Sequence, residues 1–283
     1  MIKKIFNRIL LCYKIFKSFK PLNFKAWFAL LFSLITEAIY SFLTSLLKLH
    51  ISNPRLWPRG TLPFRLRDGS IVLLRGGTED IYNMLPFRED DVDQFIRKNL
   101  CEGDVFVDVG ANVGYYTLLA SKLVGKSGRV IAVEPVPQTV AILKKNIRLN
   151  CDRNVVVIDK AAWSSKMKIQ MSIPKGFYGQ ASAVGLHKSS AFYKLDVETV
   201  SMDEITKKFR IRTIKILKID VEGSELQVLC GAKKTLEKTK YVIIELSNNI
   251  HAILELLRQA SFKTRKFKFA TYILAYRARA RNV

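Results

Sequence analysis

A chain of 283 residues is long enough for one large domain with an appendage, or for two modest domains with a sizeable core. Its net charge of +23 implies an acidic partner, such as nucleic acid, anionic lipid or an acidic substrate, without choosing among them. The four cysteines and three histidines have no metal-binding spacing, which argues against a zinc site and against a disulfide framework.

Residues 1–60 combine basic side chains with long apolar stretches, and we expect a helical extension that associates with a membrane. Between Ile2 and Phe16, apolar residues recur at helical spacing with lysines around the remainder, which is typical of a basic helix lying in a membrane surface. Residues 26–47 are apolar and long enough to cross a bilayer of about 30 Å, although Glu37 lies at their centre. Alternatively, this stretch packs as a helix on the rest of the chain or on a second subunit.

A second domain, residues 61–283, begins where short apolar runs are separated by turn signals. Asp68-Gly69 lies between its first two strand-like runs and predicts a β-hairpin. Strands and helices then alternate as strand 104–110, helix 115–124, strand 129–135, helix 136–150 and strand 155–162. This βαβαβ order is typical of a doubly wound α/β fold with a parallel sheet.

The alternation lapses after residue 162 and then resumes. We expect two strands around an irregular loop and then more regular elements: strands 166–173 and 192–200, helix 201–209, strand 214–222, a helix from Glu225, strand 241–247 and helix 250–259. Ser224 and Gln227 stand in the relation of a capping box at the start of the helix from Glu225. The runs 262–269 and 271–278 are expected to form an antiparallel pair on the sheet edge.

The turn DVGANVGYY, residues 108–116, predicts a nucleotide site. A dinucleotide fold wants a second glycine where Asn112 stands, and a P-loop wants a G-K-[ST] run that is absent here. Asp108 would repel a pyrophosphate but suits the ammonium group of S-adenosylmethionine. Glu134, at the end of the next strand, is placed to accept hydrogen bonds from both ribose hydroxyls. Asp159, at the end of the third, either reaches the adenine amino group or is a solvated turn residue.

Four runs in this order and spacing, DVGANVGYYTLLAS, VEPVPQ, LKIDVEGSELQVLCGA and YVIIELS, resemble the FkbM family of S-adenosylmethionine-dependent methyltransferases. The resemblance extends from about Phe64 to the last strand pair. It implies the Rossmann-like class I methyltransferase fold with an antiparallel last strand, and O-methylation of a small molecule, a sugar or a lipid-linked glycan. The expected contacts to the co-substrate S-adenosylmethionine are Asp108, Gly110, Ala111, Asn112, Gly114, Glu134 and Asp159.

Three acids are expected to converge on the methyl acceptor. Asp220 and Glu222 are two apart at the end of a strand and therefore point to one face, and Glu245 ends what should be a neighbouring strand. We predict that Asp220 or Glu222 is the general base and that Glu245 orients the acceptor. Alternatively, Glu222 and Glu225 complement the N-terminus of the next helix. A divalent metal on Asp220, Glu245 and Asn248 is not favoured, because monodentate acids alone make a weak magnesium site.

Other readings of the acceptor remain open. Trp163, Phe177 and Tyr178 either line an acceptor pocket or pack in the core. The chain lacks the N/D-P-P-Y/F run of amine-directed nucleic-acid methyltransferases, so a nucleic-acid acceptor is not favoured. The alternatives are an RNA methyltransferase, suggested only by the charge, and a non-catalytic membrane-associated binding protein on a methyltransferase fold.

The N-terminal extension, residues 1–60, predicts where in the cell the protein acts. A single span with the basic N-terminus inside would place the methyltransferase domain away from cytosolic S-adenosylmethionine, and the opposite orientation would break the positive-inside tendency. We therefore expect a monotopic or hairpin-like anchor that holds the protein on the cytosolic face of a membrane. The oligomeric state stays open.

Overall fold

The computed structural model describes residues 10, 13–46, 60–85, 88–150, 153–174, 178–183, 192–268 and 271–277. A seven-stranded sheet in the order β12-β13-β11-β10-β4-β5-β6 forms its centre. The strands are β4 (Val105–Val109), β5 (Arg129–Val133), β6 (Val155–Ile158), β10 (Ile214–Ile219), β11 (Thr239–Glu245), β12 (Lys263–Lys266) and β13 (Tyr272–Tyr276). β13 runs antiparallel to both of its neighbours, and the five strands from β11 to β6 are parallel. The predicted class I fold with an antiparallel last strand is confirmed.

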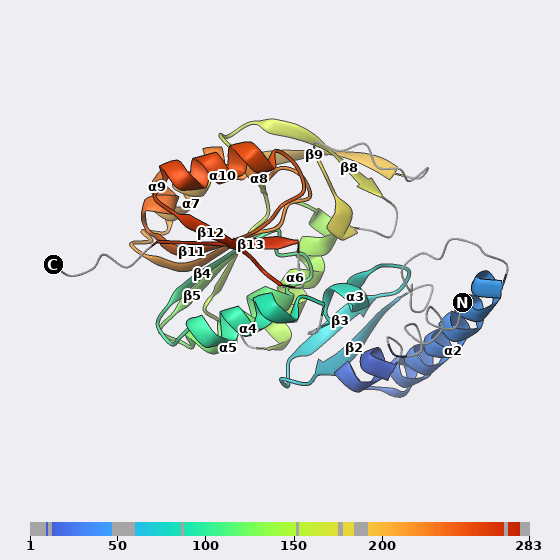
Figure 1. Cartoon of the computed structure of the whole chain (residues 1–283). Helices are drawn as coiled ribbons and strands as arrows, with labels where there is room; N and C mark the ends of the chain where they lie inside the picture. Colours follow the sequence, from blue (N-terminus) through green and yellow to red (C-terminus); the bar gives the residue numbers. More distant parts are fainter. Residues whose placement is uncertain are drawn as a thin grey trace.

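Helices cover both faces of this sheet (Figure 1). On one face, α4 and α5 pack on the strands through side chains such as Ile96 and Leu119 around Phe106. On the other, α7 to α10 pack around Val107 through side chains such as Leu229. Because both faces are covered, the central strands are nearly continuous apolar runs. After residue 60, the helices in the described part of the chain are α3 (Asp80–Asn83), α4 (Asp90–Asn99), α5 (Tyr115–Val124), α6 (Pro137–Leu149), α7 (Met202–Lys208), α8 (Glu225–Cys230), α9 (Lys233–Glu237) and α10 (Ile250–Gln259).

The expected single strand over 155–162 is wrong. β6 ends at Ile158, and β7 (Ala161–Ala162) leaves the central sheet to pair in parallel with β9 (Phe192–Val200). β9 also pairs antiparallel with β8 (Lys168–Pro174), so a small three-stranded sheet stands beside the main one. The partner of β7 is thus distant in sequence, and the charged pair Asp159-Lys160 marks the break in the run without indicating that partner.

The capping box expected at Ser224 is also wrong. Ser224 has φ −101° and ψ 13° instead of the extended backbone of an N-cap, and its side chain makes no capping hydrogen bond. The Gly223 N–H there donates to the Glu225 carboxylate at 2.9 Å. A complete capping box begins α7 instead, where the Glu204 N–H donates to Ser201 Oγ at 3.2 Å and the Ser201 N–H donates to Glu204 Oε2 at 2.9 Å.

The N-terminal extension is joined to the rest of the chain by a strand as well as by a helix. Helical residues 13–18 lead into β1 (Phe19–Pro21), which pairs antiparallel with β2 (Thr61–Leu66). β2 and β3 (Ile71–Arg75) form the predicted hairpin at Asp68-Gly69. Helix α2 (Phe24–Leu46) packs on this sheet, and one core cluster runs from Leu30 of α2 through Phe64 of β2 to Leu143 of α6.

The structure tests only part of what the sequence predicts about membrane contact by this extension. Residues 1–9, 11, 12 and 47–59 lie outside the described residues, so most of the predicted basic surface helix does too. None of the helices in the described part of the chain is long and apolar enough to span a membrane. The expectation that residues 26–47 are long and apolar enough to cross a bilayer is therefore wrong.

Candidate active site

A cavity of about 370 Å³ opens at the carboxyl ends of β4, β5, β10 and β11, the usual ligand position in an open α/β sheet. Of the ten residues predicted to form the site, nine line this cavity. They are Asp108, Gly110, Ala111, Asn112, Gly114, Glu134, Asp220, Glu222 and Glu245. The tenth, Asp159, is not among the lining residues, and its exposed carboxylate pairs with Lys144 at 3.2 Å instead.

The turn between β4 and α5 can only be built with glycine at two positions. Gly110 has φ +81°, and a Cβ there would lie 1.7 Å from the Asp220 carbonyl oxygen. Gly114 has φ +103°, and its Cβ would lie 2.6 Å from a methyl carbon of Leu143. The N–H groups of Gly110 and Ala111 donate to the Val133 carbonyl at 2.9 and 3.0 Å. The turn is therefore pinned between β5 and β10, with its backbone facing the cavity.

Asp108 presents an unpaired acceptor to this cavity. Its side chain is 1% exposed, and Oδ2 accepts a hydrogen bond from Thr117 Oγ1 at 2.7 Å. Oδ1 is buried and has no hydrogen-bond partner within the described part of the chain. Burial raises the pKa of this carboxyl, while the positive charge of Lys218 opposes the rise. A buried acceptor without a donor is costly unless a ligand supplies one, and the ammonium group of S-adenosylmethionine fits.

Glu134 is held by two backbone donors. Its Oε2 accepts from the Asn112 N–H and its Oε1 from the Val136 N–H, both at 3.0 Å. Burial nevertheless raises the pKa of Glu134 to about 7. Each oxygen keeps a further acceptor position, so the carboxylate can take both hydroxyls of a ribose. Asp108, Glu134 and the glycine turn together fit S-adenosylmethionine.

The predicted role of Glu134 at the ribose has a consequence for the pH dependence of cofactor binding. Ribose hydroxyls would donate to the ionised carboxylate, so binding would favour the deprotonated form and weaken as pH falls through about 7. We expect the affinity for S-adenosylmethionine to be constant at higher pH and to fall by up to about tenfold per pH unit below it. Calorimetric titrations across pH would measure this. The Glu134→Gln variant should bind more weakly with a flatter profile, and an unchanged slope in that variant would assign the titration to Asp108.

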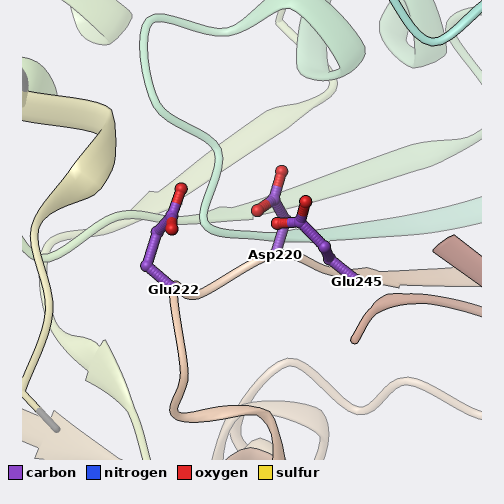
Figure 2. Close-up of side chains that lie close together, drawn as sticks. All are labelled: Asp220, Glu222 and Glu245. Atoms are coloured by element: carbon purple, nitrogen blue, oxygen red, sulfur yellow. The ribbon is translucent and has the colours of Figure 1, made fainter. Parts of the chain in front are cut away.

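The three acids predicted for the acceptor side do meet. Oxygen atoms of Asp220, Glu222 and Glu245 all lie within 4.8 Å of one another. Figure 2 shows the carboxylates of Asp220 and Glu245 side by side, with Glu222 reaching the same region from the turn after β10. Glu222 has φ +49°, an uncommon backbone conformation for a residue other than glycine, and this aims its side chain at the cavity.

Asp220 is the most firmly ionised of the three. Its Oδ2 accepts from Lys218 Nζ at 3.0 Å and from the Tyr272 hydroxyl at 2.6 Å. Burial opposes its ionisation, but the lysine charge and hydrogen bonds from Glu245 and Tyr272 outweigh burial and hold its pKa well below the usual range. A base with so low a pKa is a poor proton acceptor.

The pKa values of Glu222 and Glu245 are raised, in contrast to that of Asp220. Burial and then the charge of Asp220 raise the pKa of Glu222 to about 7 and that of Glu245 to about 8. Glu245 accepts from Thr271 Oγ1 at 2.6 Å and, when protonated, donates to Asp220. The pair Asp220 and Glu245 therefore holds one proton at neutral pH, while Glu222 is poised to take one.

A group of side chains that the sequence analysis did not single out completes the site. Lys218 is 2% exposed and lies 4.9 Å from the ring centre of Tyr116 and 5.4 Å from that of Tyr272. The Tyr116 hydroxyl donates to Glu89 at 2.8 Å, and Glu89 is ion-paired with Arg88. The available signal for Lys218 was a lysine near the end of a strand that is apolar apart from Lys215, whereas nothing in the local pattern marks Arg88 and Glu89.

The aromatic and metal expectations have mixed outcomes. Trp163 and Tyr178 line the cavity, and Phe177 lies outside the described residues. In the described part of the chain, the three clustered acids could together hold a metal ion, and they include two of the considered ligands, Asp220 and Glu245. Because Lys218 and Tyr272 already occupy Asp220 Oδ2, no metal enters the function proposed below.

The comparison that decides the family is a match over residues 108–264, the segment carrying the turn and all three acids, to the family model described as the methyltransferase FkbM domain. The chain belongs to the FkbM methyltransferase family. It is therefore an S-adenosylmethionine-dependent methyltransferase.

Individual relatives of this FkbM-family enzyme are distant. The hexuronic acid methyltransferase AglP of Haloferax volcanii is 29% identical over 192 residues, which cover 66% of this chain and 75% of AglP. A structure of an FkbM methyltransferase from Methylobacillus flagellatus is 17% identical with a TM-score of 0.44, and covers 61% of this chain and 43% of that one. An O-methyltransferase structure from Thermotoga maritima is 15% identical with a TM-score of 0.45, and covers 85% of this chain and 83% of that one.

Proposed function

We propose that the enzyme methylates a hydroxyl oxygen of a sugar, glycan or small molecule, with Glu222 as the general base. The observation that carries the proposal is a cluster of three acids beside the cofactor turn. Within this cluster, no side chain of the described residues donates a hydrogen bond to the Glu222 carboxylate, and its pKa is about 7. The optimal pKa of a general base lies near the working pH. AglP, named for hexuronic acid, supports a sugar acceptor.

On the donor side, this chain's residues hold and orient the co-substrate. Asp108 would take the ammonium group, Glu134 the ribose hydroxyls, and the backbone of Gly110 and Ala111 would lie along the methionine portion. When bound, S-adenosylmethionine supplies an activated methyl group on a sulfonium. In-line displacement requires the donor sulfur, the methyl carbon and the acceptor oxygen to lie in line. The turn, which is hydrogen-bonded to the Val133 carbonyl, therefore serves the reaction mainly by positioning the co-substrate.

On the acceptor side, the hydroxyl lies between Glu222 and Glu245. Glu222 accepts the hydroxyl proton as the carbon–oxygen bond forms and the carbon–sulfur bond breaks, which leaves a methyl ether and S-adenosylhomocysteine. Glu245 orients the acceptor, and its own position is set by Asp220 and Thr271. Lys218 keeps Asp220 ionised, and the charge of Asp220 in turn raises the pKa of Glu222.

We also propose that the reaction takes place on the cytosolic face of a membrane, with a lipid-linked glycan as one class of acceptor. The support is the net charge of +23 together with a basic, apolar N-terminal extension. Cytosolic placement keeps the site in contact with the cellular supply of the co-substrate.

The test is a comparison of glycans and lipids extracted from cells with and without the gene, before and after incubation with the purified enzyme and S-adenosylmethionine. We expect species from the deficient cells to gain one methyl group each in a Glu222-dependent manner. Methylation of RNA alone, or of no species, would contradict the proposal.

A further inference from the structure

Helix α2 has two opposite apolar faces. One is buried, with Ala26 and Leu30 at 0% and 1% exposure in the core cluster that also holds Phe64. At about 100° per residue, the other apolar side chains fall within an arc of about 140° on the far side. These outward side chains are between 48% and 78% exposed: Phe24, Trp27, Phe28, Phe32, Ile35 and Ile39.

The outward face is continuous and aromatic. The rings of Phe24 and Trp27 are stacked with centres 6.5 Å apart, and those of Phe28 and Phe32 with centres 6.1 Å apart. In Figure 1, α2 lies at the outside of the molecule, beyond β2 and β3 and away from the seven-stranded sheet. A contiguous exposed apolar surface of this kind marks an interaction site.

Positive charge accompanies this face. Residues 13–39 contain four lysines and one acid, Glu37, and Lys17, Lys20 and Lys25 are exposed. Arg67 of the neighbouring hairpin adds to them, because its Nε donates to the Lys17 carbonyl at 3.1 Å. Asp68, the acid of that hairpin, is 3.5 Å from Lys122 and also accepts from Ser70, so its charge is already compensated.

We propose that the outward face of α2 lies in the headgroup region of an anionic membrane, with the helix parallel to the bilayer. Aromatic and aliphatic side chains would enter the boundary of the acyl chains while the lysines contact anionic headgroups. A second copy of the chain is a poorer occupant, since two such faces would bring their lysines together. This surface is separate from the active site, and the inference rests on the proposed location without depending on the transfer reaction.

The experiment is co-sedimentation of the full-length protein with vesicles of phosphatidylcholine, with and without phosphatidylglycerol. We expect binding to the anionic vesicles and a loss of affinity of at least about tenfold for the triple variant Phe24→Ser, Phe28→Ser, Phe32→Ser. Each of Lys17→Gln, Lys20→Gln and Lys25→Gln should weaken anionic binding by about fivefold. The matched control changes exposed apolar residues elsewhere, Leu149→Ser, Met167→Ser and Ile250→Ser, and should bind like the unchanged protein.

Two results would overturn the inference. One is equal vesicle binding by the phenylalanine triple variant and the control variant. The other is a full-length protein that ignores both kinds of vesicle and forms dimers that the phenylalanine variant loses, because a second copy would then cover the face. Neither result depends on an acceptor, so a failed transfer reaction is distinguishable from a failed membrane contact.

Discussion

The Glu222→Gln variant should lose about two to four orders of magnitude in turnover, the range for removal of a general base. The amide keeps the size of the side chain but cannot accept a proton. Affinity for S-adenosylmethionine should stay within about twofold, because the proposed function places Glu222 on the acceptor side of the cavity. Turnover numbers from product formation and calorimetric titration with the co-substrate would measure the two effects separately.

The pH profile distinguishes a base from a merely structural residue. Turnover of the unchanged enzyme should rise with pH through about 7, because Glu222 must be ionised to accept a proton. In Glu222→Gln this rise should disappear. The comparison variant is Glu245→Gln, which should mainly raise the KM for the acceptor. If Glu245→Gln abolishes the rise of turnover with pH and Glu222→Gln retains it, Glu245 is the base.

The Lys218→Met variant should destabilise the fold by about 3–5 kcal/mol, the cost of removing one partner from a buried ion pair. Lys218 is 2% exposed, and the charges of Asp220, Asp108 and Glu89 all favour its ionised form. In the variant, these three acids stay buried but lose the positive charge of Lys218. Urea unfolding of the full-length protein would measure the difference.

The same strand provides the control. Lys215 of β10 pairs with Asp104 at 3.1 Å, but both side chains are 23% exposed, so Lys215→Met should cost about 0–1 kcal/mol. The cost of Lys218→Met should also grow with pH. Losing the lysine raises the folded-state pKa of Asp220 above its unfolded value, and a group shifted in this way loses its stabilising effect as pH rises. Equal losses of unfolding free energy in Lys218→Met and Lys215→Met would contradict the view that Lys218 stabilises the buried acids.

Local signals in the sequence were sufficient for most of the α/β core. The strand, turn and helix at 104–124 follow from a buried apolar run, two glycines and helical spacing, and α10 begins and ends as predicted. One failure is long-range, because β7 separates from β6 to pair with the distant β9. The other is local, because the capping box begins α7 at Ser201 and not α8 at Ser224.

For α2, the sequence predicted a helix with abundant apolar residues but could not assign its faces. The pairing of β1 with β2 fixes which side of the helix meets Phe64, and therefore which side is left outward. This choice depends on contacts between segments separated by a stretch of chain, not on the periodicity of the helix itself.

At the active site, the sequence by itself placed the three acids together, because neighbouring parallel strands end at one edge of the sheet. The expected strand over 214–222 was too long, since β10 ends at Ile219, and the side chain of Glu222 reaches the cavity through a turn with φ +49°. Only the tertiary structure decided what each acid can do. Tyr272, 52 residues from Asp220 along the chain, and the buried Lys218 keep Asp220 ionised. The neighbouring negative charge and burial then raise the pKa of Glu222 to about 7, and such environments arise only when distant segments pack together.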